Sequence, residues 1–246
     1  MLIALFADIH GNREAFAACL AHAQEQAVGR IIFLGDYVGY GADPAWVVDE
    51  VMTRVGLGAR AIMGNHDDAI STPSEHMNPV AAAAIDWTRT QLDRRQRNFL
   101  QNLPLSFAED DRLFVHANAW APARWGYIID RSDAARSLRA TEASTTFCGH
   151  VHVPAVYGLT AAGEIGALTP ASGVALPLDA DRRWLAVIGS VGQPRDYNPA
   201  ACYALFDDER AILTYVRVPY DCETAAQKIR NAGLPAILAD RLGHGL

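Results

Sequence analysis

Clusters of Asp, Asn and His side chains follow five short apolar runs in the first 152 residues of the chain. Imidazole nitrogen and carboxylate oxygen bind manganese, iron, zinc or nickel, and the lack of clustered cysteines in the sequence disfavours a structural zinc site. One metal ion needs about four to six donors, whereas two ions that share a carboxylate would use the whole set. The clusters are Asp8-Ile9-His10, Gly35-Asp36, Gly64-Asn65-His66-Asp67, His116 and Gly149-His150-Val151-His152.

The apolar runs before these clusters predict the strands that position them. Each run is short and alternates weakly with polar residues, which is typical of a strand buried on both faces. In an open α/β sheet the ligand crevice lies at the carboxyl ends of the strands, so we expect the clusters to converge there. The predicted strands cover residues 2–7, 31–34, 59–63, 113–115 and 145–148.

Helical patterns lie between these runs, at residues 13–28, 43–55 and 78–93. The last two begin with a capping residue followed by proline, Asp43 and Asn78 being the predicted caps. Strands that alternate with helices favour an α/β sheet with mainly parallel strands.

The second half of the chain has a different pattern. It contains short strand candidates separated by turn signals, and helical pattern returns only near the end. The sequence has no long linker, so we expect one domain over residues 1–246, built on two sheets. The predicted strands are 155–159, 184–188, 202–206 and 211–218, the helices 221–231 and 236–241, and the loop or irregular hairpin 160–177.

Taken in chain order, the polar clusters resemble the motifs of the calcineurin-like metallophosphoesterase superfamily. Residues 8–12, 35–41 and 189–196 are similar to phrases of its small bacterial phosphodiesterase-like branch. The resemblance covers about three quarters of the chain. It implies a four-layer α/β/β/α fold, in which two sheets form a sandwich flanked by helices.

The resemblance also implies a chemical role for each residue of the clusters. His66 would be the catalytic residue that stabilises or protonates the leaving oxygen, a role worth roughly 10²–10⁴ in rate. Two divalent ions, manganese or iron with zinc or nickel as alternatives, would activate a shared water. One ion would be held by Asp8, His10, Asp36 and His152, and the other by the bridging Asp36 with Asn65, His116 and His150.

Each assignment has a simpler alternative. Asp8 could cap the following helix, and His116 could be a core histidine, because it lacks the glycine that often follows it in relatives. His22, His76 and His244 match no motif and are expected to be ordinary helix or tail residues.

One departure from the family pattern concerns the two residues that follow the motif of Asp36. The Ser/Thr protein phosphatases of this superfamily carry Asp and then Arg there, whereas this chain has Gly39 and Tyr40. Without that arginine, a phosphomonoester loses a bidentate partner, which disfavours a protein phosphatase. The sequence names no other residue that would orient His66.

Three residues are candidate substrate contacts. Asn12 could touch a phosphate or only orient the loop of Asp8, and Arg195 could bind phosphate or pair with Asp196. Tyr40 belongs to a group of aromatic residues that could stack on a nucleobase or pack a loop. The other members of that group are Tyr37, Trp120, Trp125 and Tyr127.

The composition limits the other classes of protein to which the chain could belong. The 246 residues are 50% hydrophobic with a formal net charge of -7, which excludes a mostly disordered chain and argues against a dedicated nucleic-acid binder. The first apolar run is too short for a signal peptide or a membrane span, and four scattered cysteines suit free thiols. We therefore expect a cytoplasmic protein without a membrane partner, and a homo-oligomer stays open.

The leading hypothesis is a dinuclear metal-dependent phosphohydrolase. It would cleave phosphodiester or phosphoanhydride bonds of a small nucleotide-like substrate, a diadenosine polyphosphate being one version. The alternatives are a phosphomonoesterase or phosphoprotein phosphatase, and a non-catalytic scaffold on the same fold. A scaffold should lack some of the ligands or His66, and none is missing.

Overall fold

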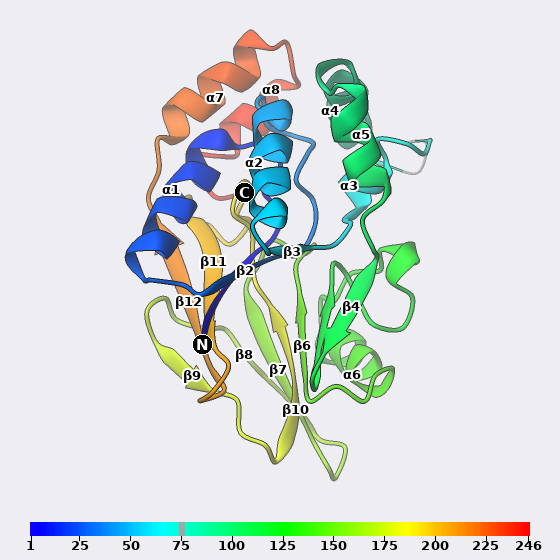
Figure 1. Cartoon of the computed structure of the whole chain (residues 1–246), viewed down its shortest axis with the longest axis vertical. Coiled ribbons are helices and arrows are strands. Elements are labelled where there is room, and N and C mark those ends of the chain that lie inside the picture. The colour runs from blue at the N-terminus through cyan, green and yellow to red at the C-terminus, as the bar shows by residue number, and fades with distance from the viewer. Residues whose placement is uncertain (74–76) are drawn as a thin grey trace.

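Two six-stranded sheets pack face to face with helices on both outer faces (Figure 1). The computed structural model describes residues 1–73 and 77–246, so His76 lies outside the described residues. This arrangement is the predicted four-layer α/β/β/α sandwich.

The first sheet contains the amino-terminal strands and has the order β3-β2-β1-β11-β12-β9. Its β1, β2 and β3 run parallel, whereas β11 pairs antiparallel with β1. The parallel half therefore ends at one edge, where the first three clusters leave the sheet. Its strands are β1 (Leu2–Phe6), β2 (Arg30–Phe33), β3 (Arg60–Ala61), β9 (Ala175–Pro177), β11 (Ala201–Asp207) and β12 (Ile212–Val218).

The second sheet has the order β4-β5-β6-β10-β7-β8. The parallel neighbours β5 and β6 deliver His116 and the last cluster to the same end of the molecule. The segment predicted as a loop or irregular hairpin, 160–177, contributes one strand to each sheet: β8 forms a hairpin with β7, and β9 pairs with β12 of the first sheet. The strands of this sheet are β4 (Ser106–Glu109), β5 (Arg112–Val115), β6 (Thr145–Cys148), β7 (Ala155–Thr160), β8 (Ile165–Leu168) and β10 (Arg182–Val187).

The helices cover the two sheets unequally. Apolar residues of α1 and α2 pack on the outer face of the first sheet, and α6 packs on the second. A separate cluster joins α7 and α8 to α4 near Tyr40. The helices are α1 (Arg13–Glu25), α2 (Pro44–Gly56), α3 (Asn65–Asp68), α4 (Pro79–Gln91), α5 (Arg94–Gln101), α6 (Arg131–Arg139), α7 (Cys222–Asn231) and α8 (Ala236–Asp240), with a 3₁₀ turn at Pro122–Arg124.

Local capping explains where two helices differ from the predictions. The predicted helix 78–93 ends at Gln91, because Asp93 and Gln96 exchange hydrogen bonds in a capping box that begins α5. Asn78 caps α4 as expected, but the carboxylate of Asp43 makes no cap hydrogen bond and accepts from Lys228 instead.

Apolar side chains from both sheets form the core between them. Phe147 of β6 packs against Phe114 of β5 and Phe206 of β11, with ring centroids 5.4 and 5.0 Å apart. The core lies directly beneath the polar loops and supports them. Within residues 1–73 and 77–246, the helices are all too short or too polar to cross a bilayer.

Candidate metal centre

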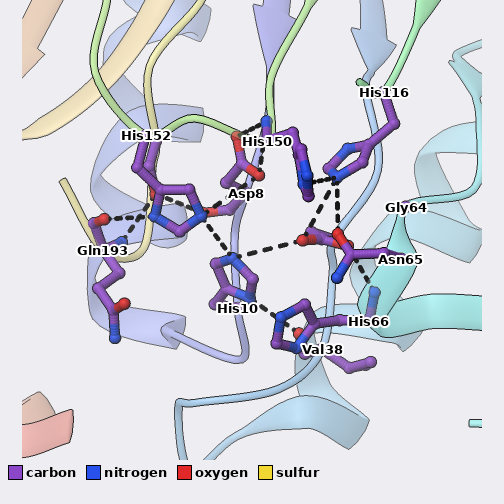
Figure 2. Close-up of polar contacts among 12 residues, drawn as sticks. Asp8, His10, Val38, Gly64, Asn65, His66, His116, His150, His152 and Gln193 are labelled. Carbon is purple, nitrogen blue, oxygen red and sulfur yellow. Dashed lines mark hydrogen bonds and ion pairs between the residues drawn. The ribbon is translucent and has the colours of Figure 1, made fainter. Parts of the chain in front are cut away.

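The predicted metal ligands lie together at the carboxyl ends of β1, β2, β3, β5 and β6 (Figure 2). All of them except Asn65 are buried. Five have a left-handed backbone, which is uncommon for residues other than glycine and is a form of strain that collects at functional sites. The chain turns sharply at these residues, so several side chains from one loop point to a common centre. The five residues are Asp8, His10, Asp36, His150 and His152.

Three groups of three side chains have donor atoms within 4.8 Å of one another, and two of these groups consist of predicted ligands alone. The third group, His10, Asp36 and His66, includes the predicted catalytic histidine. Asp36 connects the groups, because its Oδ2 lies 3.6 Å from His10 Nε2 and 3.4 Å from His116 Nε2. Asn65 Oδ1 lies 3.2 Å from the same His116 nitrogen. Asp36 thus has the position that a bridging carboxylate requires. The two groups of predicted ligands, called the first and second group below, are Asp8, His10 and His152, and Asp36, His116 and His150.

The first group shows why a cation fits. His10 Nδ1 lies 3.0 Å from Val38 O and His152 Nδ1 lies 2.6 Å from Gln193 O. A carbonyl oxygen only accepts, so both Nδ1 atoms carry hydrogen, and burial lowers the pKa of both rings well below the ordinary value. The two Nε2 atoms, 3.0 Å apart, therefore face each other with bare lone pairs. A metal ion would remove this repulsion.

The histidines of the second group also contact backbone carbonyl oxygens, but the charge state of His116 differs. His116 Nδ1 donates to Leu34 O at 2.7 Å, and His150 Nε2 donates to Trp125 O at 2.8 Å. The remaining nitrogens of the two rings are 3.2 Å apart. Burial alone would lower the pKa of His116, but Asp36 outweighs it and raises that pKa to about 9. This pocket therefore attracts positive charge.

Asp8 links the loops of the two sheets. Both of its carboxylate oxygens accept from the backbone N–H of His150, at 3.0 and 2.9 Å. A Cβ at Gly149 would lie 2.6 Å from Asp8 Oδ2, so only glycine lets β6 approach this closely. Burial raises the pKa of Asp8 to about 8. Asp8 is a ligand candidate because its carboxyl group lies with His10 and His152, and it does not cap the following helix, which Asn12 caps.

Asp67 is a supporting residue whose role the sequence did not predict. Its carboxylate accepts from the backbone N–H groups of Asp36, Tyr37 and Gly64 at 2.8–3.0 Å. These bonds hold the loop after β2 against the start of α3, which carries Asn65. In the sequence, only the position of Asp67 directly after Asn65 and His66 pointed to a role in the site.

His66 lies beside the donors, with its backbone N–H donating to Asp36 Oδ1 at 2.8 Å. Its ring centroid is 4.8 Å from that of His10 and 4.5 Å from that of Tyr40. Nδ1 is buried and has no hydrogen-bond partner among the described residues. A Cβ on Gly39 would overlap this nitrogen. Aromatic packing at the edge of Tyr40, and not a carboxylate, therefore orients His66.

Known proteins are similar to this chain in sequence and in fold. The family model of the calcineurin-like phosphoesterase superfamily domain matches residues 1–210. The chain belongs to the calcineurin-like phosphoesterase superfamily. It is 35% identical to an uncharacterized protein of Methanocaldococcus jannaschii, and the alignment covers 99% of this chain and 98% of that protein.

A solved metallophosphoesterase from Sphaerobacter thermophilus is 33% identical, with a TM-score of 0.88 and complete coverage of both chains. A more limited similarity, 30% identity over 100 residues, connects the chain to a symmetrical bis(5'-nucleosyl)-tetraphosphatase of a Janthinobacterium strain. That alignment covers 39% of this chain and 36% of the relative.

A cavity of about 810 Å³ opens beside the donor groups. His66 and His150 line it together with three of the five predicted aromatic residues. Tyr127 stacks on His150 at 4.1 Å and is 51% exposed, so one face of its ring is available. The other two lining rings are Tyr40 and Trp125.

Two aromatic residues of the predicted group serve packing instead. Tyr37 is fully buried and donates to Ile62 O at 2.6 Å. Trp120 packs against the guanidinium of Arg136 at 4.7 Å. Of the two predicted roles, stacking on a nucleobase or packing, the contacts of Tyr37 and Trp120 fit packing.

The structure separates the two remaining substrate candidates. Asn12 uses its amide within the protein, accepting from Ala15 N at 3.1 Å and donating to Gly192 O at 2.9 Å. This favours the loop-orienting alternative for Asn12. The predicted alternative in which Arg195 pairs with Asp196 is wrong, because Asp196 pairs with Arg217.

The cysteines form no disulfide, and Cys148 is buried behind the last cluster. Burial raises the pKa of its thiol, which suits a packing role.

Proposed function

We propose that this chain is a dinuclear metal-dependent phosphohydrolase that cleaves phosphodiester or phosphoanhydride bonds of a small nucleotide-like substrate. The observation that carries the proposal is the pair of facing histidine nitrogens, 3.0 Å apart, in a centre connected by Asp36. Manganese or iron suits these donors best, with zinc or nickel as alternatives. Membership of the superfamily supports hydrolysis of a phosphoester.

The proposed ligands divide as the two donor groups do. When bound, two divalent ions would supply positive charge that activates water and orients the phosphate. Asp36 would belong to both groups, and the carbonyl partners of the histidines would keep their free nitrogens directed inward. Asp8, His10 and His152 would hold one ion, and Asn65, His116 and His150 the other.

His66 would act on the substrate itself. It lines the large cavity and contacts the ring of His10, so a leaving group in the cavity would lie next to its imidazole. We propose that His66 stabilises or protonates the leaving oxygen, while Tyr127 and Trp125 accommodate a flat substituent such as a nucleobase. The partial similarity to a tetraphosphatase supports the phosphoanhydride version of this reaction.

Gly39 and Tyr40 argue against the alternative of a phosphoprotein phosphatase, because neither can supply a guanidinium to a phosphomonoester. The complete donor set argues against a scaffold. The cytoplasmic location and the lack of nucleic-acid and membrane partners stay predictions.

Hydrolysis of bis-p-nitrophenyl phosphate and p-nitrophenyl phosphate with added manganese tests the proposal. We expect diester cleavage that depends on metal and on His66. A preference for the monoester would restore the phosphatase alternative. Metal binding without turnover of either compound, or of a panel of nucleotides, would favour the scaffold.

A further inference from the structure

Arg195 is a cation that is held in place without a carboxylate partner. Its guanidinium Nη2 donates to Gln193 Oε1 at 2.9 Å, and its backbone N–H donates to His152 O at 3.2 Å. In the described part of the chain, no carboxylate forms an ion pair with Arg195, and the adjacent Asp196 pairs with Arg217. An unpaired, partly buried charge is costly, so its retention indicates that it serves a ligand.

Arg195 lies next to the metal centre but not on it. Its guanidinium carbon is 5.7 Å from the centroid of the Tyr40 ring. That ring is in turn 4.5 Å from the rings of both His10 and His66. Tyr40 therefore connects Arg195 to the donors and keeps it beside the group that would react.

Gln193 fixes the orientation of this guanidinium. It is 1% exposed, and its backbone oxygen also accepts from His152 Nδ1 at 2.6 Å. Because arginine can only donate, the amide oxygen of Gln193 must face Nη2. One edge of the guanidinium is thus held by the protein, which prepares the other donors for an acceptor from outside.

We propose that Arg195 forms an anion subsite that binds a second phosphate of the substrate, one that is adjacent to the phosphate being cleaved. A planar guanidinium matches phosphate oxygens with two parallel hydrogen bonds. This inference rests on the proposed function and narrows the substrate class to compounds with neighbouring phosphates, as in a phosphoanhydride.

Inhibition by inorganic pyrophosphate and by inorganic phosphate tests the subsite. Both inhibition constants are measured against bis-p-nitrophenyl phosphate at a fixed concentration of free manganese, for wild type, Arg195→Ala and Arg195→Lys. A charged hydrogen-bond pair is worth roughly 10–100-fold in affinity, so Arg195→Ala should reduce the preference for pyrophosphate over phosphate about tenfold or more. Arg195→Lys should lose part of the preference for pyrophosphate.

Arg139→Ala is the matched control, since Arg139 is an exposed arginine on α6, away from the centre. It removes the same charge and should leave the preference unchanged. An equal weakening of both inhibitors by Arg195→Ala, or no change in their ratio, would overturn the proposal. Arg195→Gln gives the same comparison if the alanine variant does not fold.

Failure of the proposed function would look different. Wild type would then bind manganese without cleaving the diester. In that case, calorimetric titration of the manganese-loaded protein with pyrophosphate and with phosphate still measures the preference and its dependence on Arg195.

Discussion

At the scale of single residues, His66 is held by rings and not by a carboxylate. The ring packs between His10 and Tyr40, and its Nδ1 has no hydrogen-bond partner among the described residues. Replacement by alanine should lower kcat by roughly 10²–10⁴ and leave bound metal nearly unchanged. Metal analysis of the purified variant, beside diester kinetics, checks both parts. Equal loss of metal and activity would make His66 a ligand.

Gly39 is the second residue-scale test. Its φ is +84°, and a Cβ there would overlap His66 Nδ1, so Gly39→Ala should displace the imidazole and destabilise the fold by about 1–3 kcal/mol. Gly56→Ala is the control, because Gly56 ends α2 with open space around it and alanine suits a helix. Urea unfolding and diester kinetics of both variants decide whether the strain is confined to Gly39.

The clusters that contain the seven ligand candidates were predicted from residue types at strand ends, and the resemblance to the superfamily distinguished these candidates from His66 and Asp67. The tautomers of the histidine ligands were not predicted, since the carbonyl partners Val38 and Gln193 belong to distant segments. The roles of Asp67 and Tyr40 were missed for the same reason: each depends on a contact across loops.

At the scale of elements, an ion pair connects the two sheets. Arg30, the first residue of β2, donates through both guanidinium nitrogens to Glu109, the last residue of β4, with one distance of 2.8 Å. The hydrogen bond from Arg30 lowers the pKa of Glu109 from its ordinary value of 4.5. The stabilisation is therefore complete above pH 4.5 and is lost as the pH falls through the lower, folded-state pKa.

Glu109→Gln should reduce the free energy of unfolding at neutral pH by up to about 1 kcal/mol, because the pair is partly exposed. The difference from wild type should shrink in acid, where the native carboxylate is protonated as well. Urea unfolding at a series of pH values measures this, with the exposed Glu164→Gln as control. If the variant is less stable than wild type by the same free energy at every pH, its lower stability comes from lost packing and not from the lost ion pair.

The elements that the sequence missed are short and polar. In α5, only Phe99 and Leu100 are apolar, and α6 buries little more than alanines and Leu138. Neither helix has a clear stripe of apolar residues along one face, so caps and contacts with the rest of the fold stabilise both helices. The strands of segment 160–177 are largely exposed; β8 forms a hairpin with the preceding β7, and β9 is defined by pairing with the distant β12.

At the scale of the whole molecule, the donors come from five separate segments of the chain, so metal should stabilise the entire fold. A ligand that binds only the native state at 100 times its dissociation constant adds about 2.7 kcal/mol. Removal of metal by a chelator should lower the thermal unfolding midpoint, and manganese should restore it. Asp36→Asn should respond far less to manganese, and an unchanged response would exclude Asp36 as a ligand.

The central place of β1 has a consequence for synthesis of the chain. β1 pairs on one side with β2, but its other neighbour, β11, begins only at residue 201. At 5–20 residues per second, about 10–40 s separate the two strands on the ribosome. The apolar edge of β1 stays unpaired during that time, so newly made chains should need a chaperone. Protease digestion of chains stalled before and after β11 would show whether protection of β1 arrives only with β11.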